Sequence, residues 1–305
     1  MKWLLSASSR LNFLVEKPER ERPTSRGIVR VTRRFRLDTA LSLCGILACL
    51  CGTVQAQGLI WSLPEDGQWV RYEGTYTQVA KQAESGETNL NLNWQRKITL
   101  KSVGKETADF RGESVPARWI EIKIETGNVV DNALQTGPGG VQLYKLLIPE
   151  SVIRGELFDK SIEERPVFIG GIPIIKGNRK SGDLDAISLE GGLFQIYPIV
   201  ALINHDRDNV VGDETEQVTV PAGTFPSTLI QGEKVTETTG RRSTNIYEVT
   251  RSADIPFGVV KWTATTTTEE KGSTDVRSEY KETITIKEEM QAVETGSGAE
   301  SELGN

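Results

Sequence analysis

Residues 217–225 read QVTVPAGTF, residues 246–249 read IYEV and residues 254–262 read DIPFGVVKW. This part of the chain decides the fold, because short runs of β-branched and aromatic residues cut by turn residues are typical of antiparallel strands. Two turns share one pattern, VPAG at 220–223 and IPFG at 255–258. Proline presets the backbone angle of the second turn position and glycine suits the fourth. We therefore expect strands joined by tight turns.

The preceding chain alternates between apolar and polar residues with the period of two that indicates half-buried strands. The clearest case is residues 89–100, where Trp94, Ile98 and Leu100 share a face with Leu90 and Leu92. We expect a short helix at residues 149–160, because proline and glutamate suit a first helical turn. The other expected strands are residues 68–78, 104–110, 119–124, 141–148 and 276–286.

Residues 166–211 depart from this pattern, because they are rich in glycine and contain the apolar run LFQIYPIVALI at 193–203. Eleven residues are too few to cross a bilayer, and Pro198 would break a long helix. One interpretation is a buried connection under the sheet, because apolar runs mostly form core. The other is a lid or plug over a hydrophobic cavity.

About ten evenly spaced strands without alternating helices predict a mainly β protein. A single antiparallel sheet of that size tends to curve. We therefore expect one curved antiparallel sheet, either a half-barrel or a barrel, with a short helix and a glycine-rich apolar insertion.

The N-terminal part has the pattern of a secretory signal peptide: basic residues 32–36, a mostly apolar run at 37–54, and Val-Gln-Ala at 54–56. This pattern predicts export to the periplasm or beyond, with cleavage after Ala56, so that membrane contact occurs only through the signal segment. Residues 46–49, ILAC, also resemble a lipobox, which would instead lipidate Cys49. The expected divisions are residues 1–56 as extension and signal peptide, 57–287 as the β-rich domain and 288–305 as a disordered acidic tail.

Charge and cysteine content exclude several classes of function. Residues 1–56 hold ten Lys/Arg and four Asp/Glu, which leaves 26 basic and 38 acidic residues of the chain's 36 and 42. An acidic remainder argues against nucleic-acid binding, which needs a basic surface. All three cysteines lie at positions 44–51. The exported part therefore has no thiol for a disulfide, a nucleophile or a zinc site.

No catalytic signature emerges. The chain has one histidine, His205, and neither a Gly-x-Ser-x-Gly elbow nor a phosphate-binding glycine loop. Asn204, Asp206 and Asp208 alternate as calcium ligands would, but Thr215 stands where a calcium loop has glutamate, and a solvated loop is the simpler interpretation. We expect a non-enzymatic protein with no catalytic, cofactor-binding or metal residue. A hydrolase with unmarked carboxylates stays as an alternative.

Five tryptophans follow residue 56, and most lie in or beside expected strands, as core residues do. Trp69 and Trp119 are out of phase with the apolar faces of their strands, so they are the candidates for an exposed binding role. The residues expected to line a concave apolar face are Leu90, Leu92, Trp94, Ile120, Ile122, Val260 and Trp262.

The pattern V-P-A-G-T-F at 220–225 followed by P-x-G-V-V-K at 256–261 resembles that of uncharacterised exported bacterial proteins. These in turn resemble the half-barrels of periplasmic lipoprotein carriers. The resemblance covers residues 216–287 and implies a curved sheet with an apolar concavity and a lipid or lipoprotein partner; it implies no site residue. The functional hypothesis is a non-catalytic envelope protein that binds an apolar or lipidic ligand. The alternative is a structural or protein-interaction module with a filled core.

Overall fold

A computed structural model describes residues 58–81, 89–155, 158–159, 167–168, 171–205 and 210–304. The chain divides into two compact units, residues 1–50 and 51–305, and every described residue belongs to the second. The predicted signal segment, the cleavage site and Cys49 lie outside the described residues. No helix in the described part is long and apolar enough to cross a membrane.

Strands dominate the fold, as predicted, and thirteen of them form one antiparallel sheet. The long strands of this sheet are β1 (Trp69–Ala80), β2 (Leu90–Phe110), β3 (Glu113–Val130), β5 (Gln142–Pro149), β14 (Gly223–Glu237), β15 (Arg241–Arg251), β16 (Val259–Glu270) and β17 (Lys281–Gly296). Its short strands are β4 (Ala133–Thr136), β9 (Lys176–Ser181), β10 (Ile187–Leu189), β12 (Val210–Val211) and β13 (Glu216–Val220). Two small sheets pair β6 (Phe158–Asp159) with β7 (Val167–Phe168) and β8 (Ile172–Ile174) with β11 (Gly192–Phe194).

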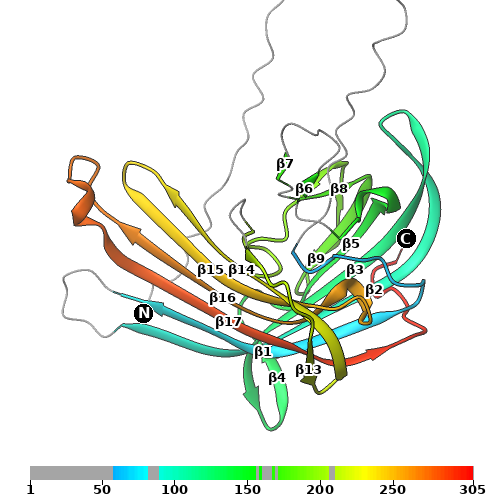
Figure 1. The fold of residues 1–305 in the computed structure, drawn as a ribbon, viewed down its shortest axis with the longest axis horizontal. Coiled ribbons are helices and arrows are strands. Elements are labelled where there is room, and N and C mark those ends of the chain that lie inside the picture. The colour runs from blue at the N-terminus through cyan, green and yellow to red at the C-terminus, as the bar shows by residue number, and fades with distance from the viewer. Residues whose placement is uncertain are drawn as a thin grey trace, which may run out of the picture. The chain divides into compact units, whose positions relative to one another are not determined.

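The main sheet is open. Its order is β10-β9-β5-β3-β2-β1-β17-β16-β15-β14-β12, with β13 on β14 and β4 on β3, and its two end strands do not pair with each other. Of the two predicted forms, the sheet is therefore the half-barrel. Figure 1 shows the sheet bending, with β14–β17 on one side and β2, β3, β5 and β9 on the other.

Strands β1 and β17 approach each other closely at Gly74. A Cβ atom on Gly74 in β1 would lie 1.8 Å from the backbone oxygen of Glu289 in β17, so glycine is required there. The register of β2 against β3 shifts between Ser102 and Lys105, where Gly104 has a φ of 139°. Because a bulge absorbs an extra residue and continues the strand, the two strands predicted at 89–100 and 104–110 are one.

The inner face of the curved sheet carries the core. Alternate residues of the central strands, including Tyr72, Ile98, Ile122, Tyr247 and Trp262, are at most 2 % exposed. Residues 194–205, which we call the inner segment, pack against this face, and Val200 and Ala201 are fully buried there. The apolar run therefore forms part of the core, as the first interpretation expected.

The predicted helix at residues 149–160 is wrong within the described part. The chain makes one 3₁₀ turn, η1 (Glu150–Val152), after which Ile153 is extended and Gly155 has a φ of 71°. A glycine in the left-handed backbone conformation commonly ends a helix. The other 3₁₀ turns are η2 (Pro256–Gly258) and η3 (Arg277–Glu279).

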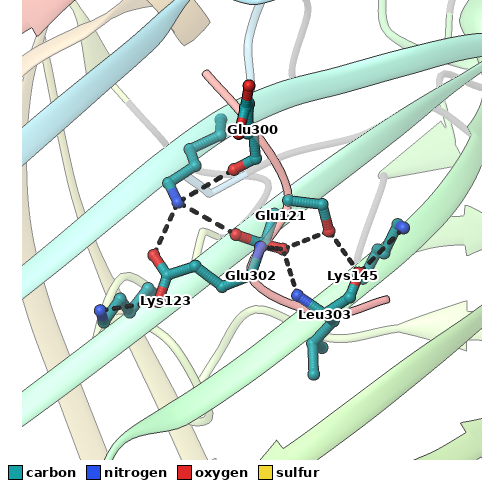
Figure 2. Close-up of polar contacts among 8 residues, drawn as sticks. Glu121, Lys123, Lys145, Glu300, Glu302 and Leu303 are labelled. Carbon is teal, nitrogen blue, oxygen red and sulfur yellow. Dashed lines mark hydrogen bonds and ion pairs between the residues drawn. The ribbon is translucent and has the colours of Figure 1, made fainter. Parts of the chain in front are cut away.

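The predicted disordered tail is also wrong. Strand β17 continues to Gly296, and residues 299–303, the C-terminal strap, bind the outer face of β2, β3 and β5. The carboxylate of Glu121 in β3 is fully buried and accepts hydrogen bonds from Ser301 Oγ at 2.7 Å and from the backbone amides of Glu302 and Leu303 at 2.9 and 3.2 Å. Figure 2 shows these contacts converging on Glu121.

Lysines complete the attachment of the strap. Lys101 lies 3.2 Å from Glu121 and 2.7 Å from Glu302, and Lys123 lies 2.8 Å from Glu302. Buried Lys145 donates to the backbone oxygen of Leu303 at 3.1 Å. The acidic residue Glu302 therefore docks on the sheet, because two lysines lie opposite its carboxylate.

Removal of residues 300–305 is expected to lower the free energy of unfolding by about 2–4 kcal/mol. The deletion strips three donors from the Glu121 carboxylate, whose hydrogen bonds contribute roughly 1.5–3 kcal/mol each. Water that reaches the uncovered carboxylate offsets more than half of that loss. Urea denaturation followed by tryptophan fluorescence measures the change.

Glu300→Gln serves as the control for this truncation, because Glu300 contributes its backbone oxygen to Lys101. It should leave the urea midpoint unchanged. A truncated chain as stable as the full chain would show that the strap does not stabilise the sheet.

Candidate functional site

A buried ion pair holds the inner segment on the sheet. Arg96 on β2 and Glu288 on β17 are 6 % and 0 % exposed, and Arg96 Nη1 lies 2.8 Å from Glu288 Oε2. Arg96 Nη2 donates to the backbone oxygen of Val200 at 2.7 Å, and the Leu202 amide donates to Glu288. The Trp262 indole donates to Glu288 Oε1 at 2.5 Å. Both ions therefore bind each other and the backbone of the inner segment.

Burial raises the pKa of Glu288, and three contacts oppose that rise: the charge of Arg96, the Trp262 indole and the Leu202 amide. Desolvation disfavours the charged form of a carboxyl group, whereas a nearby cation and hydrogen-bond donors favour it. The ion pair is thus satisfied only while the inner segment and Trp262 stay in place.

Asn245 on β15 fixes the next residues of the inner segment. It is 1 % exposed, and its Nδ2 donates to Leu202 O and to Thr266 Oγ1, each at 2.8 Å. Its Oδ1 accepts from the Asn204 amide at 3.1 Å. Lys234 on β14 donates to Asn204 Oδ1 at 3.2 Å. Backbone groups of the segment that are removed from water therefore find side-chain partners on the sheet.

A cavity of about 480 Å³ opens beside this ion pair, and we call it the hollow. Tyr76 and Trp94 form one wall, with ring centroids 6.4 Å apart and ring planes inclined by 24°. Its described lining is Tyr76, Trp94, Arg96, Ile124, Thr126, Gly137, Pro138, Gly139, Gly140, Gln142, Pro198, Leu202 and Ile286. The inner segment therefore supplies two residues of the wall, Pro198 and Leu202, and also belongs to the core.

The glycine-rich turn at residues 137–140 forms the rim of the hollow, in agreement with its loop-forming sequence. The Gly137 amide donates to Thr126 O at 2.9 Å, and a Cβ atom on Gly137 would lie 3.2 Å from the Trp94 ring. Gly140 has a φ of 60°, and a Cβ atom there would lie 2.7 Å from the Cα of Gly182. Small residues thus let this turn approach both the indole and a neighbouring turn.

The predicted lining residues separate into three groups. Trp94 lines the hollow. Leu92 is half-buried and Leu90 is 54 % exposed near the start of β2. The remaining four, Ile120, Ile122, Val260 and Trp262, are buried in the core.

The sequence analysis did not predict the ion pair of Arg96 and Glu288, but the sequence contains a pattern that indicates it. Arg96 alternates in phase with Trp94 and Ile98, so it is a cation on an apolar face. Glu288 likewise follows Ile286 by two positions on β17. Because charged residues are seldom fully buried unless they are paired, two opposite charges on apolar faces indicate a buried ion pair.

Trp69 and Trp119, the expected exposed tryptophans, are both half-buried. The Trp69 ring lies close to the backbone of Gly296. The Trp119 indole donates to Glu106 at 3.0 Å, and Lys145 and Lys176 lie over its ring on the outer face. Neither tryptophan therefore presents a free flat surface.

His205 is a neutral core residue at the end of the inner segment. Its ring centroid lies 5.3 Å from that of Trp61 and 4.8 Å from that of Tyr247, both edge-on. Both ring nitrogens are buried without a hydrogen-bond partner, and burial, with the charges of Arg251 and Lys234, lowers the pKa to about 3. An unprotonated, unpartnered imidazole among aromatic rings packs as an apolar side chain does.

Of the proposed calcium ligands, Asn204 is described and binds Lys234, whereas Asp206 and Asp208 lie outside the described residues. Within the described part, no group of three or more His, Cys, Asp or Glu side chains is arranged to hold a metal ion. Burial raises the pKa of the Glu288 carboxyl group, and this group is ion-paired with Arg96 under the inner segment.

No protein-family model matches the sequence, and no curated protein matches it. A function for this chain therefore has to be argued from the geometry of its own residues.

Replacement of His205 by leucine is expected to flatten the pH dependence of stability. The wild-type folded state keeps the ring neutral down to about pH 3, whereas the unfolded chain binds a proton below about pH 6.5. The unfolded state therefore binds more protons in this window, and stability falls as the pH falls. From pH 7 to pH 5 the wild type should lose about 2 kcal/mol more than His205→Leu.

Urea denaturation at the two pH values measures this difference, with Lys234→Met as a control that removes one neighbouring charge but keeps the imidazole. Parallel losses in the wild type and in His205→Leu would show that the ring is protonated in the folded protein.

Proposed function

We propose that this chain is an exported protein that holds an apolar or lipidic ligand in the hollow of its curved sheet. The observation that carries the proposal is the hollow itself. Its volume of about 480 Å³ lies within the roughly 300–1,000 Å³ of small-molecule sites. The signal-peptide pattern at residues 32–56 supports the exported location.

The chemistry of the wall supports an apolar ligand. Tyr76 and Trp94 offer a broad aromatic surface, and Ile124, Leu202 and Ile286 add aliphatic surface. The described lining includes no carboxylate, and its one charged side chain, Arg96, is already ion-paired with Glu288. Burial of apolar ligand surface, at roughly 25 cal/mol per Å², would thus supply most of the affinity.

Preorganisation favours this proposal over a structural module with a filled core. A filled core leaves few voids larger than a water molecule, whereas the hollow stays open while Arg96, Glu288 and Asn245 hold the segment beside it. The resemblance to the half-barrels of lipoprotein carriers agrees with a lipid or lipoprotein partner. The hydrolase alternative would need two facing acids in the cleft, and the described wall of the hollow carries none.

Trp94→Leu is expected to weaken binding of 1-N-phenylnaphthylamine, an apolar dye that fluoresces in dry sites, by about tenfold. The indole forms half of the aromatic wall, and loss of an aromatic pair together with its buried area amounts to roughly 1.4 kcal/mol or more. Thr126→Phe, which fills the hollow from β3, should abolish binding. Fluorescence titration measures both affinities.

Trp119→Leu is the matched control, because Trp119 is also half-buried but lies on the outer face of β3. It should bind the dye as the wild type does. Equal affinity in all four proteins, or no dye binding by the wild type, would overturn the proposal. Native mass spectrometry of protein purified from its own envelope then identifies the natural ligand, whose added mass should be absent from Thr126→Phe.

A further inference from the structure

A second cavity, of about 490 Å³, lies where β14 and β15 meet the segment that leads into β1, and we call it the arginine cavity. Its lining includes Trp61, Arg154, Thr228, Arg251 and Ser252. The described lining contains two arginines and four hydroxyl side chains but no carboxylate. It shares no residue with the hollow.

Arg251 is held in one orientation. Its guanidinium carbon lies 3.6 Å from the centroid of the Trp61 ring, and its Nη2 donates to Gly155 O at 3.0 Å. Trp61 is itself fixed, because its indole donates to Gly58 O at 2.7 Å and its amide donates to Phe257 O at 2.9 Å. The planar cation therefore has an aromatic support behind it and a backbone anchor at one end.

Among the described residues, this half-buried cation has no acidic partner. Arg251 makes no ion pair with any described residue, and its buried Nε has no hydrogen-bond partner. Burial lowers the pKa of Arg251 to about 10. An unpaired guanidinium that has been withdrawn from water is costly, and an anionic ligand would remove that cost.

The other charged residue in the described lining of the cavity is also a cation. Arg154 lies on the same cavity wall, and Lys234 acts with Arg251 to lower the pKa of His205 behind Trp61. By contrast, Arg242, on the same strand as Arg251, is bound by both oxygens of Glu269 at 2.6 Å. Among the described residues, Arg242 thus has the acidic partner that Arg251 lacks.

We propose that the arginine cavity binds a phosphate group, with Arg251 as the principal ligand and Arg154 as a second cation at the wall. A guanidinium presents a fork of N–H donors that matches phosphate oxygens. The hydroxyls of Thr228 and Ser252 line the same space. The phosphate comes either from the free ion or from the headgroup of a lipid, and the two sources share this chemistry.

Isothermal titration calorimetry of the full chain with inorganic phosphate and with dodecyl phosphate tests the proposal. Saturable binding is expected for the wild type, and Arg251→Met should weaken it at least tenfold, because a charge-assisted hydrogen bond contributes roughly 1.5–3 kcal/mol. Tighter binding of dodecyl phosphate than of inorganic phosphate would identify a lipid source, and equal affinities a free anion.

Two further variants keep the test decisive. Arg154 is exposed, so Arg154→Gln should fold normally and weaken phosphate binding severalfold even if Arg251→Met does not fold. Arg242→Gln removes the same charge from β15 outside the cavity and should leave the affinity unchanged. Absence of saturable binding of both probes to the wild type, or equal affinities in the wild type and Arg154→Gln, would overturn the proposal.

Discussion

The ion pair between Arg96 and Glu288 is the interaction on which the inner side of the sheet depends. It joins residues 192 positions apart in the sequence, and it lies under the inner segment with both side chains almost fully buried. Removal of two ions from water is costly, and mutual attraction offsets that cost only when the remaining donors and acceptors are also satisfied. Val200, Leu202 and Trp262 provide those contacts, so the pair and the inner segment stabilise each other.

The outer face uses the same principle with a different segment. Glu121 is as fully buried as Glu288, and the C-terminal strap satisfies it with a hydroxyl and two amides. Among the described residues, each face of the sheet thus carries one buried carboxylate that accepts hydrogen bonds from a segment outside the sheet. All cysteines of the chain lie at positions 44–51. Such polar attachments and the core therefore stabilise residues 58–304, as disulfides stabilise many small exported domains.

The strands were predictable because period-two patterns and turn residues are local signals. The continuity of β2 was not, since Gly104 reads as a break when its bulge partner on β3 is unknown. The prediction of a helix at 149–160 was wrong because Pro149 and Glu150 suit the first turn of any type of helix. Gly155, with its positive φ, ends the helical conformation after one turn. The prediction of a disordered tail was wrong because the order of the tail depends on Glu121 and on lysines distant in sequence. Amino-acid composition does not show such distant partners.

The hollow was only partly predictable for the same reason. Its aromatic wall comes from Tyr76 on β1 and Trp94 on β2, and alternation marked Trp94 as inward-facing. Its other wall comes from residues that the chain brings back over the sheet, including Leu202 and the turn at 137–140. Arg251 offered no sequence signal, because only the fold shows that it stacks on Trp61 with no acidic partner among the described residues.

The central claim is that polar contacts with the sheet hold the inner segment fixed, so that the hollow exists before any ligand arrives. Amide hydrogen exchange of residues 200–204 in the ligand-free protein tests it most directly, because exchange reports how often a segment leaves its hydrogen-bonded state. The expected result is that the Leu202 and Asn204 amides, which donate to Glu288 and Asn245, exchange as slowly as the amides of β1 and β2. Exchange at the rate of exposed loops, while the sheet stays protected, would contradict the account.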